Sequence, residues 1–468
     1  VRAGGGPMGE GRTSRVIGAL CAAAVLIIGG LAIGAGRAAT AAPEGAGRAT
    51  HEGVASCAGS TCHSRQVDSG INIRQNELIT WQDPSSVAGA HSRAYRVLYE
   101  ARGQAIIRKM GLGANGVAQQ CLGCHADPAP AGQRGARFQL SDGVGCEACH
   151  GGSSAWLASH RTVTGTHADN VSRGLRPLEN PKVRAGVCLD CHFGGSKPGQ
   201  FVSHEIMAAG HPRVAFELDL FSSLQQHWDV DADYVKRKTY AGGVKTWAVG
   251  QALALDRALT LYGQPGRNNG AFPELYFFDC HACHRQISDD PKARPQWQAN
   301  PGRPIPSGTP PFNDENMIML SAAAKVVAPG LAARFDADSR AFHAALARDR
   351  AESIRAAGKL AATSRALADA FAARNFSRAE TLAIVDVVLQ GEIARRYTDY
   401  AGSAQAVMAA DTLLNALVKS GQVDPDAAAR IRPNLDRAYA QVRDPNSYRP
   451  DAFRASLAQV AQAARSLR

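Results

Sequence analysis

Five short segments of this chain each hold two cysteines followed at once by a histidine. In four of them two residues separate the cysteines, and in the first four residues do so. The cysteines are Cys57 and Cys62, Cys121 and Cys124, Cys146 and Cys149, Cys188 and Cys191, and Cys280 and Cys283. The histidines that follow them are His63, His125, His150, His192 and His284. Cys-x-x-Cys-His is the attachment signature of c-type haem, in which each thiol forms a thioether with the porphyrin and the histidine ligates the iron.

Chance and the other uses of cysteine account poorly for this repeat. With 11 cysteines and 14 histidines in 468 residues, random order gives about 0.01 copies of Cys-x-x-Cys-His. Only Cys21 lies outside the five motifs, so no cysteine is left for a structural disulfide. Zinc sites built from cysteine pairs would not need the trailing histidine. We therefore predict five covalently bound haem c groups, although a disulfide or metal pair is the alternative at Cys57 and Cys62.

Nine histidines lie outside the motif positions, whereas five irons need at most five distal ligands. Two imidazoles saturate an iron, which favours electron transfer over substrate chemistry. The metal-ligand candidates among the nine are His91, His160, His204 and His211. The spacing of seven between the last two would place both imidazoles on one helical face. The weaker candidates, more typical of surface or propionate-binding residues, are His51, His167, His227, His281 and His343.

The N-terminal 41 residues have the pattern of an export signal. Arginines precede an uncharged apolar run over 16–33, and Ala39-Thr40-Ala41 offers a small-residue cleavage site. The pattern predicts a cleaved signal peptide or, because the run is just long enough to span a bilayer, an inner-membrane tether. Both predict a periplasmic location. The net charge of +11 does not indicate nucleic-acid binding, because ten haem propionates of about −1 each would offset most of it.

The motifs all fall in the first part of the chain, which is rich in glycine and shows few helical periodicities. We predict a mainly α protein with a multihaem cytochrome c domain of little regular secondary structure over 42–290. A proline-rich linker or strap over 291–315 and an all-α helical bundle over 316–468 would follow. Helices are predicted over 246–262, 337–374, 403–420, 426–443 and 450–467, and another begins at a capping box of Ser377 and Glu380. The bundle is expected to dock or stabilise the molecule.

Residues 57–192 resemble the tetrahaem cytochrome c-554 family, electron carriers associated with hydroxylamine oxidation in nitrifying bacteria. The similarity rests on GAHSRAY around His91, CLGCH, GVGCEACHGG, SHR at His160 and the fourth motif, in that order. The resemblance implies that His91 and His160 are distal ligands of other haems. It also implies that the haem at His125 lacks a distal ligand. The lengthened first motif, the fifth motif and the helical bundle depart from the family, so its redox partner is not carried over.

The sequence thus predicts a periplasmic pentahaem cytochrome that relays electrons through bis-histidine haems between redox partner proteins. The motifs at 121–125 and 146–150 are close in sequence, which predicts two stacked porphyrins at the centre of the series of haems that carries the electrons, called the wire below. The alternative is an oxidoreductase that acts on a small nitrogen or sulfur species at one five-coordinate haem, that of His125. A Cys-x-x-Cys-Lys motif marks one nitrite-reducing class, and the chain has no such motif. Its absence weakens the support for the alternative.

Overall fold

The computed structural model describes residues 49–66, 75–112, 119–197, 199–213, 216–269, 272–284, 298–306 and 308–468. The predicted signal peptide, with the apolar run 16–33, lies outside the described residues, as does the first part of the predicted linker, 291–297. Ala49–Arg468 cluster as a single unit. Within the described residues, no helix is both long enough and apolar enough to cross a membrane.

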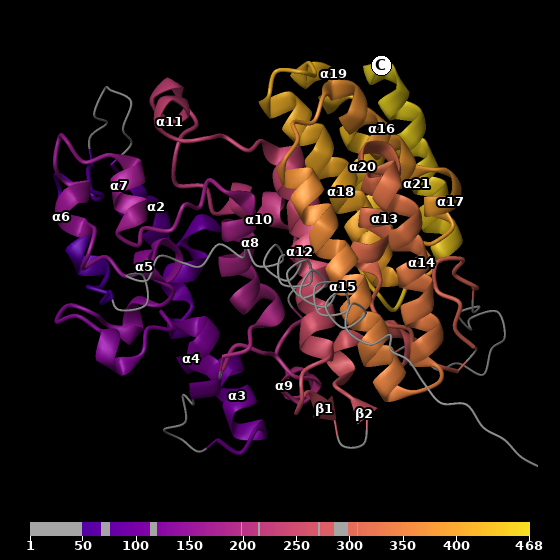
Figure 1. Ribbon diagram of the computed structural model, residues 1–468, viewed down its shortest axis with the longest axis horizontal. Helices are drawn as coiled ribbons and strands as arrows, with labels where there is room; N and C mark the ends of the chain where they lie inside the picture. The colour runs from indigo at the N-terminus through magenta and orange to yellow at the C-terminus, as the bar shows by residue number, and fades with distance from the viewer. Residues whose placement is uncertain are drawn as a thin grey trace, which may run out of the picture. The chain divides into compact units, whose positions relative to one another are not determined.

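The region that holds the five motifs is built from short helices joined by loops (Figure 1). Its first α-helices are α2 (Glu77–Gln82), α3 (Ala101–Lys109), α4 (Gln119–His125), α5 (Cys146–His150), α6 (Leu157–His160) and α7 (His167–Ser172). They are followed by α8 (Pro181–Leu189), α9 (His204–Ala208), α10 (Leu218–Leu224) and α11 (Ala232–Arg237). The 3-10 turns are η1 (Val54–Ser56), η2 (Ala88–Arg93), η3 (Arg96–Tyr99), η4 (Ala131–Gln133), η5 (Leu140–Asp142), η7 (Leu275–Phe277) and η8 (Cys280–Ala282), and η6 (Asp190–Gly194) is a π-turn. The predicted scarcity of long elements is confirmed in this region.

One long helix, α12 (Gly243–Tyr262), joins the motif region to the C-terminal helices. Its fully buried large side chains are Trp247, Leu255, Leu259, Leu261 and Tyr262. A helix that is largely apolar must be covered by other elements. Gly250 lies against Leu218 of α10, and the Ser364 hydroxyl of α15 (Arg350–Ala372) donates to the Ala252 carbonyl at 2.7 Å. The helix predicted over 246–262 is therefore present and lies inside the molecule. A short antiparallel pair, β1 (Asn268–Asn269) with β2 (Phe272–Pro273), follows it.

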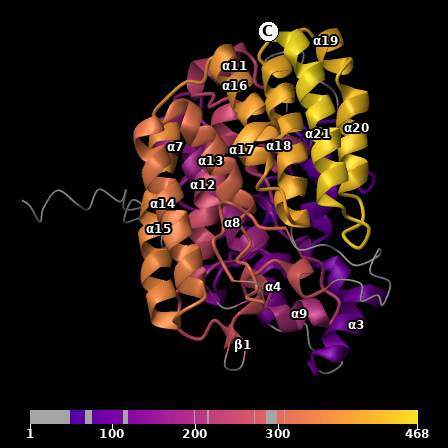
Figure 2. The same ribbon diagram turned by 90° about the vertical axis from the view of Figure 1, so that its right-hand side faces the viewer.

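The C-terminal part is all α-helical, as predicted. Its helices are α13 (Glu315–Val327), α14 (Pro329–Leu346), α15 (Arg350–Ala372), α16 (Arg378–Leu389), α17 (Gly391–Ala394), α18 (Tyr400–Lys419), α19 (Pro425–Ala429), α20 (Arg432–Gln441) and α21 (Pro450–Ala464), and the turn η9 (Arg465–Leu467) ends it. Figure 2 shows α14 beside α15 and α20 beside α21. The capping box of Ser377 and Glu380 opens α16. The helix predicted over 337–374 is two helices, because Asp349 caps a new one at the Glu352 amide.

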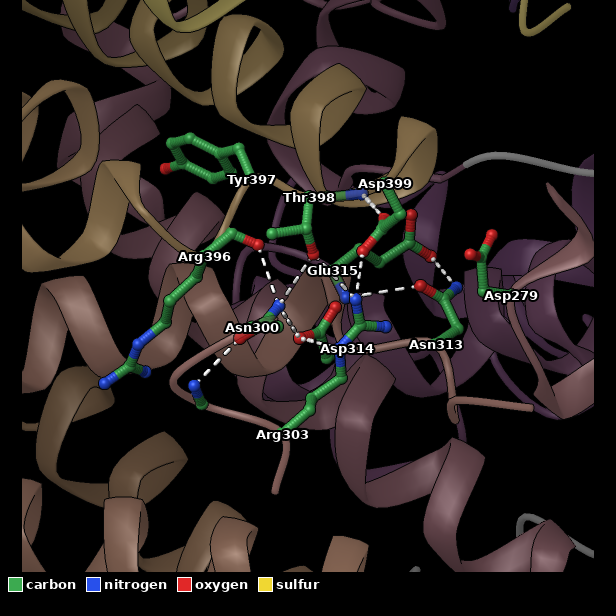
Figure 3. Close-up of polar contacts among 12 residues, drawn as sticks. Asp279, Asn300, Arg303, Asn313, Asp314, Glu315, Arg396, Tyr397, Thr398 and Asp399 are labelled. Carbon is green, nitrogen blue, oxygen red and sulfur yellow. Dashed lines mark hydrogen bonds and ion pairs between the residues drawn. The ribbon is translucent and has the colours of Figure 1, made fainter. Parts of the chain in front are cut away.

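The described part of the proline-rich segment, called the strap below, buries the side chains of Asn300 and Arg303, whereas Pro301, Pro304 and Pro306 are exposed. Arg303 contacts Asp314 at 3.1 Å and Asp399 at 2.6 Å, and Asn300 donates to the Arg396 carbonyl at 2.8 Å (Figure 3). Arg303 is only 7% exposed. Burial raises the pKa of Asp314 to about 7, and Arg303 opposes that rise. These contacts tie the strap to the C-terminal helices, so this stretch behaves as a strap and not as a free linker.

Replacing Arg303 by methionine should lower the free energy of unfolding by about 3–5 kcal/mol, because Asp314 and Asp399 would stay buried without their cation. Urea denaturation followed by far-ultraviolet circular dichroism measures this loss. The matched control is Arg348→Met, whose partner Glu352 forms a pair that is 60% and 41% exposed, and there we expect a loss of about 0–1 kcal/mol. Equal losses in the two variants would contradict a structural role for the strap.

Candidate haem-binding sites

Each motif is placed by a short helical element. The second and third motifs lie in α4 and α5, the fourth crosses from α8 into η6, the fifth forms η8, and the first directly follows η1. One turn of helix brings the two thiols and the imidazole to the same side of the backbone. The ten cysteines of the motifs are free thiols in this structure. The disulfide alternative for Cys57 and Cys62 is therefore not seen.

Each motif histidine lies opposite a histidine from elsewhere in the chain. The pairs are His63 with His160 (6.0 Å between ring centroids), His192 with His91 (6.0 Å), His125 with His211 (6.2 Å), His150 with His227 (6.3 Å) and His284 with His204 (5.9 Å). Every pair joins one motif histidine to one other histidine, and no histidine belongs to two pairs. Five motifs thus give five separate pairs.

The separation within these pairs fits an iron atom between two imidazoles. A bond from a metal to an imidazole nitrogen is about 2.0 Å long, and adding the ring radius on both sides puts the two centroids about 6 Å apart. Rings in direct face-to-face contact would lie closer together. The residues present therefore suit a haem held by two thioethers and two axial imidazoles at each motif.

Burial keeps four of the paired imidazoles, those of His91, His150, His160 and His192, in the neutral form that binds metal. It lowers the pKa of His150 to about 3 and that of His192 to about 4. It also lowers the pKa of His91 and His160. A neutral imidazole keeps a ring nitrogen with a free electron pair, and this nitrogen is what a metal needs.

The Nδ1 atoms of several paired histidines are held by hydrogen bonds. In three of them the acceptor is a backbone carbonyl: Ala94 for His125 (2.7 Å), Pro212 for His211 (2.7 Å) and Gln225 for His227 (2.9 Å). His63 instead has its Nδ1 2.9 Å from a carboxylate oxygen of Glu77. A histidine that donates from Nδ1 presents Nε2 to the metal in a fixed orientation.

Two buried donors beside the third motif suit haem propionates. Ser153 Oγ and Trp156 Nε1 are buried, and neither has a hydrogen-bond partner among the described residues. Ser153 follows the motif at 146–150, and the Trp156 ring lies 5.6 Å from that of His160. Buried donors are costly when unpaired, and an ionised propionate is a strong acceptor.

The remaining histidines have other partners. His51 lies 2.8 Å from Asp127, and His167 lies 2.8 Å from Glu179. The His281 ring lies 4.9 Å from the Tyr400 ring, and the His343 Nδ1 lies 2.9 Å from the Ser339 carbonyl oxygen. The structure therefore offers no support for His343 as an iron ligand.

The structure corrects one sequence-based expectation about distal histidines. His204 and His211 do not share a helical face, because α9 ends at Ala208 and Gly210 has a φ of +120°, which turns the chain away. They lie instead opposite two different motif histidines. The resemblance also implied an open haem at His125, whereas the His211 ring lies 6.2 Å from the His125 ring.

Sequence reasoning underrated His227, which lies opposite His150. It follows Gln225 and Gln226 and precedes Trp228 and Asp229, with no spacing or motif that marks a ligand. A count of the ligands required could have identified it. Five motifs need five distal histidines, and the sequence argument named only four.

Comparison with known proteins finds a family similarity in the first part of this region. Residues 56–151 match the family model described as cytochrome c554 and c-prime. Searches of curated proteins and of solved structures find no match to the chain. The matched stretch holds the first three motifs, including the irregular one at Cys57, while the fourth and fifth lie beyond it. The chain therefore carries a cytochrome c554-like segment and is a c-type cytochrome of electron transfer with covalently bound haem c.

Proposed function

We propose that the chain is a periplasmic pentahaem cytochrome that relays electrons between two redox partner proteins through bis-histidine haems. The observation that carries the proposal is the set of five separate histidine pairs, one at each motif. Each haem, when bound, supplies a one-electron couple of its iron. The paired imidazoles hold the iron from both sides, which excludes substrates and leaves electron transfer as the chemistry. The signal-like residues 1–41 support export, as covalent haem attachment outside the cytoplasm requires.

We infer the spatial order of the haems, numbered in chain order, from the cysteines. Two pairs of thiols from different motifs are hydrogen-bonded, Cys57 with Cys146 and Cys124 with Cys191. Burial raises the pKa of Cys188, and Cys149 lies near enough to add to that rise. These contacts would put the first haem beside the third, the third beside the fourth, and the fourth beside the second. The wire would therefore not follow the chain, and the sequence-based expectation that the second and third haems form the central stack has no support in these contacts.

The fifth haem continues the wire from the second. Arg213 Nη1 lies 3.3 Å from the Cys280 sulfur, and Arg213 is only two residues beyond His211. The short segment that contains α9 carries both His204, opposite His284, and His211, opposite His125. We propose the order first, third, fourth, second, fifth, with the first and fifth haems at the ends.

The alternative function, an oxidoreductase with one open haem at His125, requires a free iron face. The His211 ring stands 6.2 Å from the His125 ring, which counts against a free face there. No other observation favours it.

Electron paramagnetic resonance of the oxidised holoprotein tests the proposal, combined with a haem count on the same sample. We expect five haems per chain, all low-spin, and no carbon monoxide binding after reduction. A high-spin ferric signal, or a ferrous fraction that binds carbon monoxide, would favour the open-haem alternative. Fewer than five haems would contradict the pentahaem assignment.

A further inference from the structure

The first haem differs from two others in what its motif histidine contacts. His63 has its Nδ1 2.9 Å from a carboxylate oxygen of Glu77. His125 at the second haem has the Ala94 carbonyl as its acceptor, at 2.7 Å. His192 at the fourth haem has a buried Nδ1 with no hydrogen-bond partner in the described part of the chain. The three motif histidines therefore present an anionic acceptor, a neutral acceptor and none.

The fold holds Glu77 firmly against His63. Glu77 is the first residue of α2, and the backbone amide of the next residue, Leu78, donates to the His63 carbonyl at 2.9 Å. The other end of α2 is anchored by Trp81, whose Nε1 donates to the Val144 carbonyl at 3.1 Å. The Glu77 side chain keeps 23% of its surface exposed, so water solvates its charge.

The fourth haem has the opposite environment. The His192 ring lies 5.2 Å from the rings of both Phe216 and Phe221. These rings bring no charge and no acceptor to the imidazole. The contacts with Phe216 and Phe221 therefore add no electron density to His192.

A carboxylate that accepts the Nδ1 proton makes the imidazole a stronger base and a stronger electron donor to the metal. A stronger donor stabilises the ferric state, and so does the negative charge of the carboxylate itself. Both effects lower the reduction potential, which second-shell hydrogen bonds are known to tune in haem sites. A carbonyl acceptor has the weaker form of this effect, and a histidine without an acceptor has none.

We propose that Glu77 sets the reduction potential of the first haem below those of the second and fourth haems, so that electrons enter the wire at the His63 end. Electrons run from lower to higher potential, and the first haem is terminal in the proposed order. A donor protein would therefore deliver its electrons there, one for each iron reduced from ferric to ferrous. Glu77 acts through His63 and is a positioning residue. This inference rests on the bis-histidine relay proposed above.

The first haem can be told apart from the second and fourth, because the planes of its two imidazoles are nearly parallel. The interplanar angle is 9° for His63 and His160, against 86° at His125 and 72° at His192. Near-parallel planes give a rhombic low-spin resonance, and near-perpendicular planes give one with a much larger maximum g value. A redox titration monitored by electron paramagnetic resonance therefore reports the first haem apart from the second and fourth.

The test is Glu77→Gln in the full-length holoprotein, a change that keeps the shape and an acceptor but removes the charge. We expect about a tenfold shift in the reduction equilibrium of the rhombic signal, or about 59 mV upward for one electron. The large-g signals should not move. The matched control is Glu179→Gln, which removes the charge from a histidine–glutamate contact of 2.8 Å at His167, a histidine outside the five pairs. No potential should move in the control.

The outcomes separate this inference from the proposed function. A wild-type protein with five low-spin haems, whose rhombic signal titrates at the same potential in Glu77→Gln, would overturn the role of Glu77 and leave the relay standing. The same holds if the rhombic signal titrates above the large-g signals in the wild type. A wild-type protein with high-spin iron or fewer than five haems would instead remove the relay itself.

Discussion

Replacing His211 by alanine should convert one haem of the five from low-spin to high-spin. His211 stands opposite His125, and among the described residues it is the histidine whose ring faces His125. Ligation of the iron by His125 should be unaffected, because the His125 Nδ1 contact to the Ala94 carbonyl at 2.7 Å does not involve His211. We expect a new high-spin ferric signal equal to one iron per chain and carbon monoxide binding to the same fraction after reduction.

Two further measurements make this prediction specific. Added imidazole should refill the open position and restore the low-spin signal, which a misfolded protein would not do. His167→Ala is the matched control, because His167 is also partly buried and hydrogen-bonded, but to Glu179 and not opposite a motif histidine. Its spectrum should stay that of the wild type. A His211→Ala protein without high-spin iron would show that His211 is not the axial ligand of this haem.

The attachment motifs could be read directly from the sequence because haem attachment is a local chemistry. Two thiols and one imidazole must reach a single porphyrin, and one helical turn provides this. The helices of the C-terminal part were also predictable, since each needs only an apolar face and a cap. Ser377 and Glu380 marked one start correctly. The break before α15 was missed although Asp349 and Glu352 have the same spacing, and in the structure the Glu352 carboxylate accepts a hydrogen bond from Arg348.

Distal histidines could not be assigned from sequence in the same way, because they are brought in by the fold. His160 and His63 are almost a hundred residues apart, and His227 lies on a loop beyond α10 without any local pattern. The resemblance to a family pointed to His91 and His160, and the structure places both opposite motif histidines. At His125 the resemblance implied no distal ligand, whereas the structure places His211, which lies beyond the stretch that matches the family, opposite His125.

The boundary between the motif region and the helical bundle was the other expectation that sequence could not settle. Proline-rich stretches often separate independent domains, and the composition changes sharply after 315. In the structure, however, α12 precedes the strap in sequence and packs among helices that follow it. Gln251 of α12 contacts Asn316 of α13 at 2.7 Å and Gln405 of α18 at 3.3 Å. Residues 49–468 form a single unit for this reason.

Ending the chain after residue 314 should therefore unfold more than the part removed. Truncation would expose the side of α12 that meets the C-terminal helices, which includes Trp247 and Tyr262. Each large side chain contributes about 1.5–3 kcal/mol when buried, and α12 carries five that are at most 1% exposed. Their sum, roughly 8–15 kcal/mol, is comparable with the whole stability of a typical domain, about 5–15 kcal/mol.

The fifth haem should be the first cofactor affected by this truncation. Its motif is held from the C-terminal side, because the His281 ring lies 4.9 Å from Tyr400 and Arg303 of the strap interacts with both Asp279 and Asp399. We expect the truncated protein to carry fewer haems than the full-length protein and to be cleaved by trypsin within 243–284. Val235→Ala in the full-length chain, at a side chain 57% exposed, is the control and should change neither readout. A truncated protein that keeps five haems and resists the protease would show that α12 folds without the helices around it, and the strap would then be an ordinary linker between two domains.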